Sequence, residues 1–456
     1  MDDLTAARLQ MEVSLAFHMV FAAAGVALPV MMLLAEGLWI RHGHQEALAL
    51  ARTWAKATGL LFAIGAVSGT ALSFELGLLW PRFLAFAGPL IGPAFAFEGY
   101  AFFLEAIFLG LYLYGWQRLS PHAHWLCGLM VALSGAASAV LVVSANAWMQ
   151  QPVGFRLADG QPQDIDPVAA LFNPSWPLMA LHSTMACYTA VGFAAAGLYA
   201  WALLHDRRPE RVGYNRLALA IALAVGLVGA ITMPLSGDLL ARRAAHVQPA
   251  KLAALEGQFR TERGAPLRIG GWPDPALGET RYAIEIPRLL SLLATEDPDG
   301  LVLGLDAFPR DEWPEARIVH PAFQVMVGAG VLLLALGLWG AIAWWRGRRD
   351  GRWPRRPLLW GLVAGAPLGF VALEAGWIVT EVGRQPWVIY GVMRTRDAVT
   401  TVGGVGWTLA GFTLLYLLLG ATLVILLRRL AAGEPAVPAP VAPTPAPHPT
   451  PQLPGA

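Results

Sequence analysis

Nine apolar stretches, each long enough to cross a bilayer, follow one another along this chain of 456 residues. They lie near 11–36, 56–80, 92–116, 124–147, 177–204, 214–235, 321–345, 357–381 and 405–428. About 20 predominantly apolar residues in a helix span the hydrocarbon core of a membrane. The pattern therefore predicts an all-α polytopic membrane protein with about nine transmembrane helices.

Two polar regions interrupt or follow this pattern. A long segment, about 237–319, separates the sixth and seventh predicted helices and contains several Pro-Gly turns. Residues 433–456 are rich in Pro and Ala, a composition typical of disordered or polyproline-like chain. The sequence thus predicts a single transmembrane domain over 1–432, with one long loop and a disordered tail over 433–456.

Composition agrees with the hydropathy pattern. The chain is 56% hydrophobic and 14% charged, with a mean hydropathy of +0.52. These values are too apolar for a soluble protein of this length. The net charge of +1 gives no reason to expect nucleic-acid binding. Cys127 and Cys187 both lie inside apolar stretches, which argues against a disulfide framework.

Basic residues in the short loops predict the orientation of the chain. Loops on the cytoplasmic side of a membrane carry an excess of Lys and Arg. One set of predicted loops holds most of them: Arg41, Arg52, Lys56, Arg118, Arg207, Arg208, Arg211, Arg216, Arg346, Arg348, Arg349, Arg352, Arg355, Arg356, Arg428 and Arg429. We therefore expect the C-terminus in the cytoplasm and the N-terminus and the 237–319 loop outside.

Six polar or sulfur-containing side chains from six predicted helices then fall in the outer third of the membrane. A charged residue in hydrocarbon costs at least ~2.5–3.5 kcal/mol, so such residues mark function. Each alone could be a packing or hydrogen-bonding residue, but a shared depth favours a shared site. His, Met and Glu at one level suit axial ligation of haem iron. The six are His18, Glu98, Asn146, His182, Met326 and Glu381.

Further carboxylates lie deeper in the predicted helices. Glu98 and Glu105 are seven residues apart, so both lie on one helix face about 10 Å apart. Ser138 is expected at the depth of Glu105, and Glu374 lies two turns from Glu381. These residues favour a proton relay. The alternative is a set of carboxylates that neighbouring helices satisfy by hydrogen bonds.

Seven motifs, in this order along the chain, identify a resemblance. They are "ARLQMEVSLAFHMVF", "FEGYAFFLEAIFLGLYLYGW", "SANAWMQQP", "LMALHSTMACY", "AKLAALE", "FQVMVG" and "EAGWIVTEVGRQPW". Together they resemble subunit I of cytochrome bd-type quinol oxidases, over all of the chain except the tail. The resemblance implies an enzyme of the bacterial cytoplasmic membrane that oxidises ubiquinol or menaquinol at its outer face. It also implies reduction of dioxygen to water, with proton uptake from the cytoplasm.

The resemblance implies a role for each matching residue. Iron ligands would be His182 and Met326 for a low-spin haem b, and His18, Glu98 and Glu381 for a high-spin haem b and a haem d, or a third haem b. Quinol would bind at Lys251, Glu256 and Asp238, and protons would pass Glu98, Glu105, Ser138 and Glu374. Residues around the haems would be Arg8, Asn146, Trp377, Arg384, Gln385 and Trp387. A subunit II is implied, with a small single-helix subunit as a further candidate.

Some positions depart from the family's pattern. Gln324 stands where many members have Arg, and Ala147 and Gln151 replace the more usual Gly and Asn. The short 237–319 loop resembles the cyanide-insensitive branch. Two other functions stay open for intramembrane carboxylates: a proton-coupled transporter, and a haem b protein that reduces quinone. Nine spans with no visible internal repeat argue against the transporter.

Overall fold

The computed structural model describes residues 2–206, 208–347 and 353–432. Nine helices in these ranges are long and apolar enough to cross a membrane, as the hydropathy pattern predicts. Their bounds are α1 Asp3–His42, α2 Gln45–Leu79, α3 Pro81–Tyr114, α4 Pro121–Gln150, α6 Trp176–His205, α7 Pro209–Val247, α10 Ala316–Gly347, α11 Arg356–Gly365 with α12 Leu368–Val382, and α14 Val405–Ala432. The predicted fold class is confirmed.

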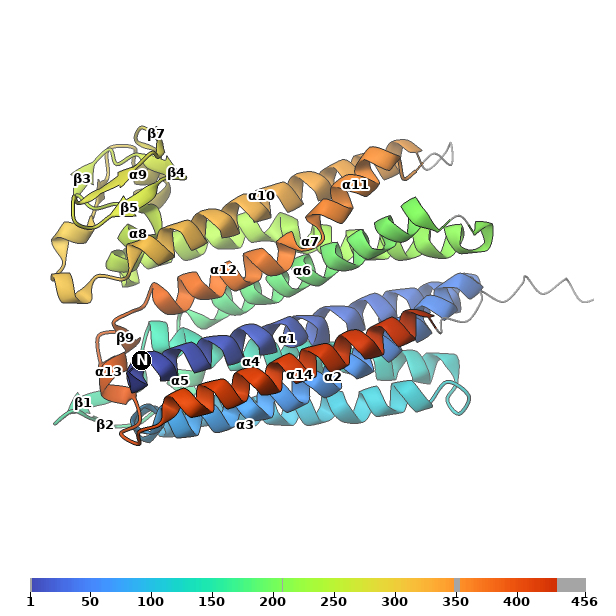
Figure 1. Cartoon of the computed structure of the whole chain (residues 1–456), viewed down its shortest axis with the longest axis horizontal. Helices are drawn as coiled ribbons and strands as arrows, with labels where there is room; N and C mark the ends of the chain where they lie inside the picture. The colour runs from blue at the N-terminus through green and yellow to red at the C-terminus, as the bar shows by residue number, and fades with distance from the viewer. Residues whose placement is uncertain (1, 207, 348–352, 433–456) are drawn as a thin grey trace, which may run out of the picture.

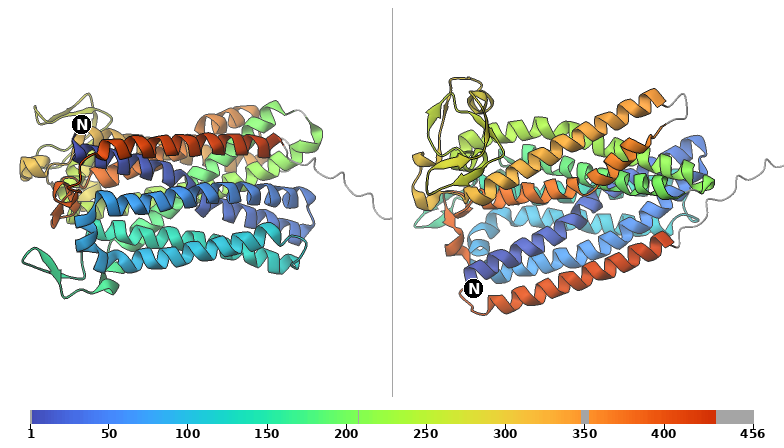
Figure 2. Two further views of the ribbon diagram at one scale, coloured as in Figure 1. Left: turned by 60° about the horizontal axis from the view of Figure 1, so that its bottom comes forward. Right: turned by 45° about the horizontal axis from the view of Figure 1, so that its top comes forward.

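The long helices lie side by side in one bundle (Figure 1). Consecutive helices pack as hairpins: α1 on α2, α3 on α4, and α6 on α7. Helix α1 is central, because it also contacts α4, α6 and α14. Figure 2 shows α14 along the outside of the bundle, where it covers α1 and α2.

Prolines and glycines set many of the helix ends. Helices α3, α4 and α7 begin with Pro81, Pro121 and Pro209, where the missing N–H costs no helical bond. Helix α1 starts at an Asp2 cap and ends at Gly43, whose φ of 71° is left-handed. Several helices extend well past the predicted spans, since the α-helix needs no lipid to continue.

The sequence predicts the eighth span as one continuous helix, but the structure divides it into two helices. Helix α11 ends at Gly365 and α12 begins at Leu368, with Pro367 between them. Proline supplies no N–H and its ring crowds the preceding turn, so the helix is interrupted there. Gly197 of α6 lies against the break, where any side chain would clash with Ala366. The bend is thus packed closely against α6.

The predicted 237–319 loop is shorter than expected, because α7 continues to Val247. Residues 248–315 form a small segment at one end of the bundle, called the outer segment after its expected side of the membrane. Its apolar side chains around Leu252, Leu255 and Phe259 share one core with α10 and α12. It contains three two-stranded antiparallel ladders, β3 with β8, β4 with β7, and β5 with β6. Its elements are α8 Pro249–Glu256, β3 Glu262–Arg263, β4 Leu267–Ile269, β5 Trp272–Asp274, β6 Glu279–Arg281, β7 Ile284–Ile286, α9 Leu289–Thr295, β8 Leu301–Val302 and two short 3₁₀ turns, Leu305–Ala307 and Arg310–Glu312.

The other short elements lie at the same end of the bundle as the outer segment (Figure 1). They are β1 Arg156–Ala158, β2 Gln161–Gln163, α5 Pro167–Leu171, β9 Trp387–Ile389, β10 Met393–Arg394 and α13 Thr395–Ala398. The N-terminal end of α1 is also there, whereas α14 ends at the opposite end. The tail 433–456 and the predicted loop residues Arg207, Arg348, Arg349 and Arg352 lie outside the described residues.

Candidate functional site

His18 of α1 lies against a Ser-Gly pair on α2. Ser68 donates its hydroxyl hydrogen to the carbonyl oxygen of Gly65 at 3.1 Å, so its oxygen accepts from His18 Nδ1 at 3.0 Å. A neutral imidazole has one N–H, and this bond places it on Nδ1. A side chain at Gly69 would come within 2.9 Å of His18 Cε1. The Nε2 lone pair is thus left to bind a metal.

His182 of α6 has the same surroundings on α7. Ser236 donates to the carbonyl oxygen of Thr232 at 3.0 Å, and its oxygen lies 2.8 Å from His182 Nδ1. Gly237 follows, and a side chain there would lie 3.6 Å from His182 Cε1. Metal-bound histidines typically have their second nitrogen held by such a bond. Sequence reasoning missed both serines, although each stands directly before a glycine.

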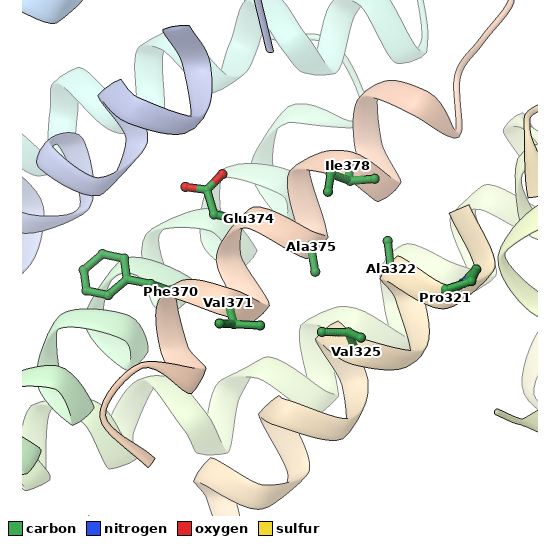
Figure 3. A pocket seen from close by; sticks show the side chains of 8 residues that line it. All are labelled: Pro321, Ala322, Val325, Phe370, Val371, Glu374, Ala375 and Ile378. Atoms are coloured by element: carbon green, nitrogen blue, oxygen red, sulfur yellow. The ribbon is translucent and has the colours of Figure 1, made fainter. Parts of the chain in front are cut away.

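Met326 of α10 faces α12 across a glycine. A side chain at Gly376 would lie 3.1 Å from Met326 Sδ, so this glycine makes room for the thioether. An apolar groove of about 500 Å³ runs between α10 and α12 beside this contact (Figure 3). It is lined by Pro321, Ala322, Val325, Phe370, Val371, Glu374, Ala375 and Ile378.

Glu374 is the charged member of this lining. Figure 3 shows its carboxylate pointing away from Val325 and Ala375, toward the interior of the bundle. Its Oε1 atom is buried and has no hydrogen-bond partner among the described residues. A buried carboxylate without a partner is costly. This residue therefore remains a candidate for carrying protons.

Glu381 ends α12 and is held from two sides. Asn146 Nδ2 of α4 donates to its Oε1 at 2.5 Å, and Arg384 donates to its Oε2 at 2.5 Å. The structure therefore brings three of the predicted site residues together. Arg384 is 2% exposed, and its Nη1 has no hydrogen-bond partner in the described part of the chain. A buried guanidinium nitrogen of this kind fits an anionic propionate.

The remaining residues expected around haems have diverse contacts. Gln385 accepts a hydrogen bond from Thr395 at 2.7 Å, which fastens the turn after α12. The Arg394 guanidinium lies over Trp387, 5.2 Å from the centre of the indole ring. Trp377 packs against the main apolar core. Arg8 is half-buried near Glu12 on α1. Their roles at a haem stay predictions.

The predicted relay residues are on adjacent helices α3 and α4. Ser138 donates a hydrogen bond to Glu98 at 2.9 Å. It therefore lies beside Glu98, whereas the sequence predicted it at the depth of Glu105. Glu105 is 5% exposed, and its Oε1 has no hydrogen-bond partner within the described ranges. Gly25 and Gly135 lie next to this carboxylate and leave space around it.

Lys251 of α8 reaches from the outer segment into the bundle. Its Nζ donates to Gln150 Oε1 at 3.2 Å and to the carbonyl oxygen of Thr380 at 3.3 Å. Burial, followed by the charge of Arg384, lowers the pKa of Lys251 to about 7, against a smaller opposing effect of Glu381. Lys251 is therefore adjacent to Asn146, Glu381 and Arg384, called the Glu381 cluster below. Its sequence position did not predict this proximity.

Glu256 lies at the other end of α8, away from Lys251. It is 4% exposed, and its Oε2 lacks a hydrogen-bond partner among the described residues. Burial raises the pKa of Glu256 to about 7, although the charge of Arg268 opposes the shift. A carboxyl group with this pKa can accept and release protons near neutral pH.

One sequence interpretation of this region needs correction, and one departure from the family's pattern has a visible contact. Asp238 is not in a loop, because it lies within α7 and accepts a hydrogen bond from Arg242 at 2.8 Å. Gln324, which stands where many relatives have Arg, contacts the outer segment. It accepts from the backbone of Gly270 at 3.0 Å and donates to the carbonyl oxygen of Arg268 at 3.1 Å. Its amide thus fastens β4 to α10.

Sequence reasoning also missed His320 of α10, which is fully buried. Its two ring nitrogens lie 2.6 Å from the carbonyl oxygen of Leu255 and 2.9 Å from that of Gly270. It therefore connects α8 and the outer strands to the bundle. The signal was its position six residues before Met326, at the start of an apolar stretch.

The described residues contain no group of three or more His, Cys, Asp or Glu side chains that could hold a bare metal ion. Single histidine, methionine and carboxylate ligands in apolar surroundings instead suit haem iron, whose other ligands come from the porphyrin. A model of the family described as "Cytochrome bd terminal oxidase subunit I" matches residues 6–435. The chain belongs to this family.

Relatives and a solved structure agree with the family. A Bacillus subtilis (strain 168) protein, provisionally named a cytochrome bd menaquinol oxidase subunit I, is 39% identical over 94% of this chain and 96% of its own. The Escherichia coli (strain K12) cytochrome bd-II ubiquinol oxidase subunit 1 is 30% identical over 95% of this chain and 97% of its own.

The bd oxidase structure from Geobacillus thermodenitrificans matches with a TM-score of 0.88 and 37% identity, over 95% of this chain and 99% of that one. The fold and the oxidase class expected from the sequence are thereby confirmed. The chain is a subunit of a terminal oxidase of respiratory electron transport, and haem and iron binding follow from the family.

Proposed function

We propose that this chain is the haem-binding subunit of a quinol:dioxygen oxidoreductase. It oxidises quinol at the end of the bundle that carries the outer segment and reduces dioxygen to water at a high-spin haem pair. The names of the Bacillus subtilis and Escherichia coli relatives, which are menaquinol and ubiquinol oxidase subunits, support the reaction. Membership in a terminal oxidase family argues against a transporter and against a quinone reductase that does not use dioxygen.

The observation that carries the proposal is the state of two histidines. In both His18 and His182 the Nδ1–H group donates a hydrogen bond to a serine hydroxyl oxygen on the next helix, which leaves Nε2 free as an iron ligand. We assign His182 and Met326 to a low-spin haem b. His18, Glu98 and Glu381 serve a high-spin haem b and a haem d, or a third haem b. The haems, when bound, supply the electron transfer and the chemistry of dioxygen.

At the outer segment, Lys251 and Glu256 are the quinol-binding candidates. Quinol oxidation releases two protons, and Glu256 has a pKa of about 7, which suits it to accept one. Lys251, which has a similar pKa, is a donor or acceptor beside the Glu381 cluster. Asp238 is the weaker candidate, since Arg242 of its own helix occupies its carboxylate.

Proton uptake for dioxygen reduction would run along α3 and α4 from the opposite end of the bundle. Glu105 receives protons from that end of the bundle and passes them toward Glu98. Ser138 orients Glu98 by its hydrogen bond. Glu374 is a second candidate because its carboxylate faces the bundle interior (Figure 3). The basic loops predict that this opposite end is cytoplasmic, so uptake and release lie on different sides of the membrane.

The assembly follows from the family. A chain described as subunit I acts with a subunit II, and we expect a small single-helix subunit as a further component. The nine spans indicate a multi-pass membrane protein, which we place in the bacterial cytoplasmic membrane. Residues 1–432 act as one transmembrane unit, with 248–315 as its quinol-binding part.

Haem analysis and oxygen uptake on the purified complex test the proposal directly. A pyridine haemochrome assay with haem extraction should count three haems and report whether one is d-type. Added quinol should drive consumption of dioxygen. Haem bands without quinol-driven oxygen uptake would favour a quinone reductase, and a preparation free of haem would overturn the proposal.

Replacing Glu105 with Gln tests the proton path. Gln matches Glu in size and helix propensity but cannot ionise. Glu105→Gln should therefore keep haem content and the dithionite-reduced spectrum while oxygen consumption falls sharply. Disturbed high-spin bands would indicate a ligand role instead, and normal turnover at full haem content would refute the relay.

A further inference from the structure

A buried polar cluster lies at the end of the bundle opposite the outer segment. It consists of Glu36 of α1, Tyr112 of α3 and His124 of α4, all at most 2% exposed. Glu36 Oε1 lies 2.7 Å from His124 Nδ1, and the carbonyl oxygen of Tyr112 lies 2.8 Å from His124 Nε2. Three helices therefore meet at one histidine side chain.

The hydrogen bonds of His124 allow one proton to reside on either His124 or Glu36. A carbonyl oxygen can only accept, so Nε2 must carry a hydrogen to bond Tyr112. The hydrogen between Nδ1 and Glu36 belongs either to an imidazolium beside a carboxylate or to a carboxylic acid beside a neutral imidazole. Both arrangements keep the 2.7 Å bond. The pair thus holds one shared proton in either arrangement, and release of that proton leaves one of the two hydrogen bonds of His124 without a hydrogen.

Aromatic rings and further polar groups surround His124. The His124 ring packs against Tyr112 and Trp116, whose ring centres are 4.2 and 4.0 Å away. Aromatic faces stabilise an adjacent cation. Arg52 of α2 lies over Trp116 on the exposed side, 5.1 Å from the ring centre. The Cys127 thiol also lies close enough to interact with Glu36.

The cluster continues toward Glu105 along one face of α3. Glu98, Glu105 and Tyr112 are spaced by seven residues, or about 10 Å along the helix axis for each step. Gly135 of α4 lies against the Glu105 carboxylate, and Gly128 lies against the Tyr112 ring. These glycines keep bulky side chains out of the boundary between α3 and α4.

Three polar atoms of Glu36, Tyr112 and Glu105 are buried and have no hydrogen-bond partner within the described ranges. They are Glu36 Oε2, Tyr112 Oη and Glu105 Oε1. Buried polar groups without protein partners are normally satisfied by ordered water. The Tyr112 hydroxyl lies near the Glu36 carboxylate, with no hydrogen bond between them. The polar groups thus form a route from the end of the bundle to Glu105.

We propose that Glu36, His124 and Tyr112 form the entrance at which protons are loaded before they reach Glu105. Protons from the adjacent aqueous phase join the Glu36–His124 pair and leave past the Tyr112 hydroxyl. No covalent bond other than those to hydrogen changes in this transfer. The proposal rests on the proposed oxidase function and extends its proton path to the surface.

Proton uptake by the intact oxidase complex tests the entrance. The fully reduced enzyme is mixed with dioxygen in weakly buffered solution containing a pH dye. Glu36→Gln keeps hydrogen bonds to His124 but cannot ionise, so uptake should slow about tenfold or more, within the usual effect of positioned proton transfer groups. Haem content and the dithionite-reduced spectrum should not change.

Trp125→Phe is the matched control. Trp125 of α4 donates to the carbonyl oxygen of Leu33 on α1 at 3.2 Å, so it connects the same two helices without an ionisable group. If Glu36 only joins α1 to α4, both variants should lose stability alike and keep wild-type uptake per haem. Slow uptake confined to Glu36→Gln is the result expected for a proton entrance.

Glu105→Gln, measured beside it, separates the two proposals. Slow uptake in Glu105→Gln with wild-type uptake in Glu36→Gln would overturn the entrance and leave the relay intact. Wild-type uptake in both would overturn the relay and the entrance together. If Glu36→Gln fails to assemble, Tyr112→Phe decides, because it keeps the ring and removes the hydroxyl. Wild-type uptake by Tyr112→Phe would then refute the entrance.

Discussion

Replacing Glu256 with Gln should stabilise the docking of α8 at alkaline pH. The difference between the usual pKa of 4.5 and the value of about 7 reflects burial of a carboxylate with an unpartnered Oε2. At ~1.4 kcal/mol per pH unit this difference corresponds to about 3 kcal/mol. The folded carboxyl binds protons more tightly, so the destabilisation is small near pH 5, grows above it, and is complete above pH 8.

Gln is neutral at every pH and nearly the same size as Glu. Glu256→Gln should therefore slow hydrogen exchange of the α8 amides about 100-fold at pH 8.5, the equivalent of about 3 kcal/mol, and only a few-fold at pH 5. Exchange measured by mass spectrometry on the intact complex reports this local opening. Glu279→Gln is the control, because the Glu279 carboxylate is exposed in the same segment and should change exchange little.

Equal protection of α8 at pH 5 and pH 8.5 in Glu256→Gln, relative to the unsubstituted protein, would refute this reasoning. Quinol kinetics on the same preparation give an independent result. If Glu256 accepts a proton from quinol, kcat for quinol oxidation should fall while the haem spectra stay intact. A stabilised α8 with unchanged quinol kinetics would leave the burial argument standing and remove Glu256 from the quinol site.

Four further substitutions test other contacts. Met326→Leu keeps a similar volume but has no sulfur, so the low-spin haem spectrum should be lost while the fold remains; unchanged low-spin bands would contradict the assignment. Lys251→Ala should slow quinol oxidation and leave haem spectra intact, and unchanged quinol kinetics would argue for a purely structural side chain. Ser236→Ala removes the acceptor for His182 Nδ1 and should weaken retention of the low-spin haem about 10- to 100-fold in a haem-transfer assay. The equivalent Ser68→Ala should affect only the high-spin bands.

The nine spans could be predicted because lipid imposes one rule on all of them, an apolar stretch of sufficient length. Helix ends could not, because they lie in water, where caps and tertiary contacts decide. Helix α7 continues to Val247 through a polar stretch, which moves Asp238 from the predicted loop into a helix. Pro367 was visible in the sequence, but hydropathy does not register a break within an apolar run.

The site was partly predictable for a similar reason. Ionisable residues such as Glu105 and His182 stand out in apolar sequence because their burial is expensive. Ser68 and Ser236 do not stand out, since a serine inside a membrane helix can always bond its own backbone. Glu36 and His124 lie near predicted span ends, where polar residues are expected, and only the three-dimensional structure shows them buried together.

The bond from Lys251 to Thr380 has a thermodynamic consequence. Thr380 precedes Glu381 directly, so one backbone carbonyl connects the outer segment to a carboxylate at the candidate haem site. A quinone-like ligand that draws Lys251 away from Thr380, and so shifts Glu381, would change the free energy of whatever binds at Glu381. Linkage makes the effect reciprocal: binding at Glu381 changes the affinity of the quinone site by the same factor. A quinone site at Lys251 and a haem site at Glu381 would then be coupled at equilibrium, apart from any flow of electrons between them.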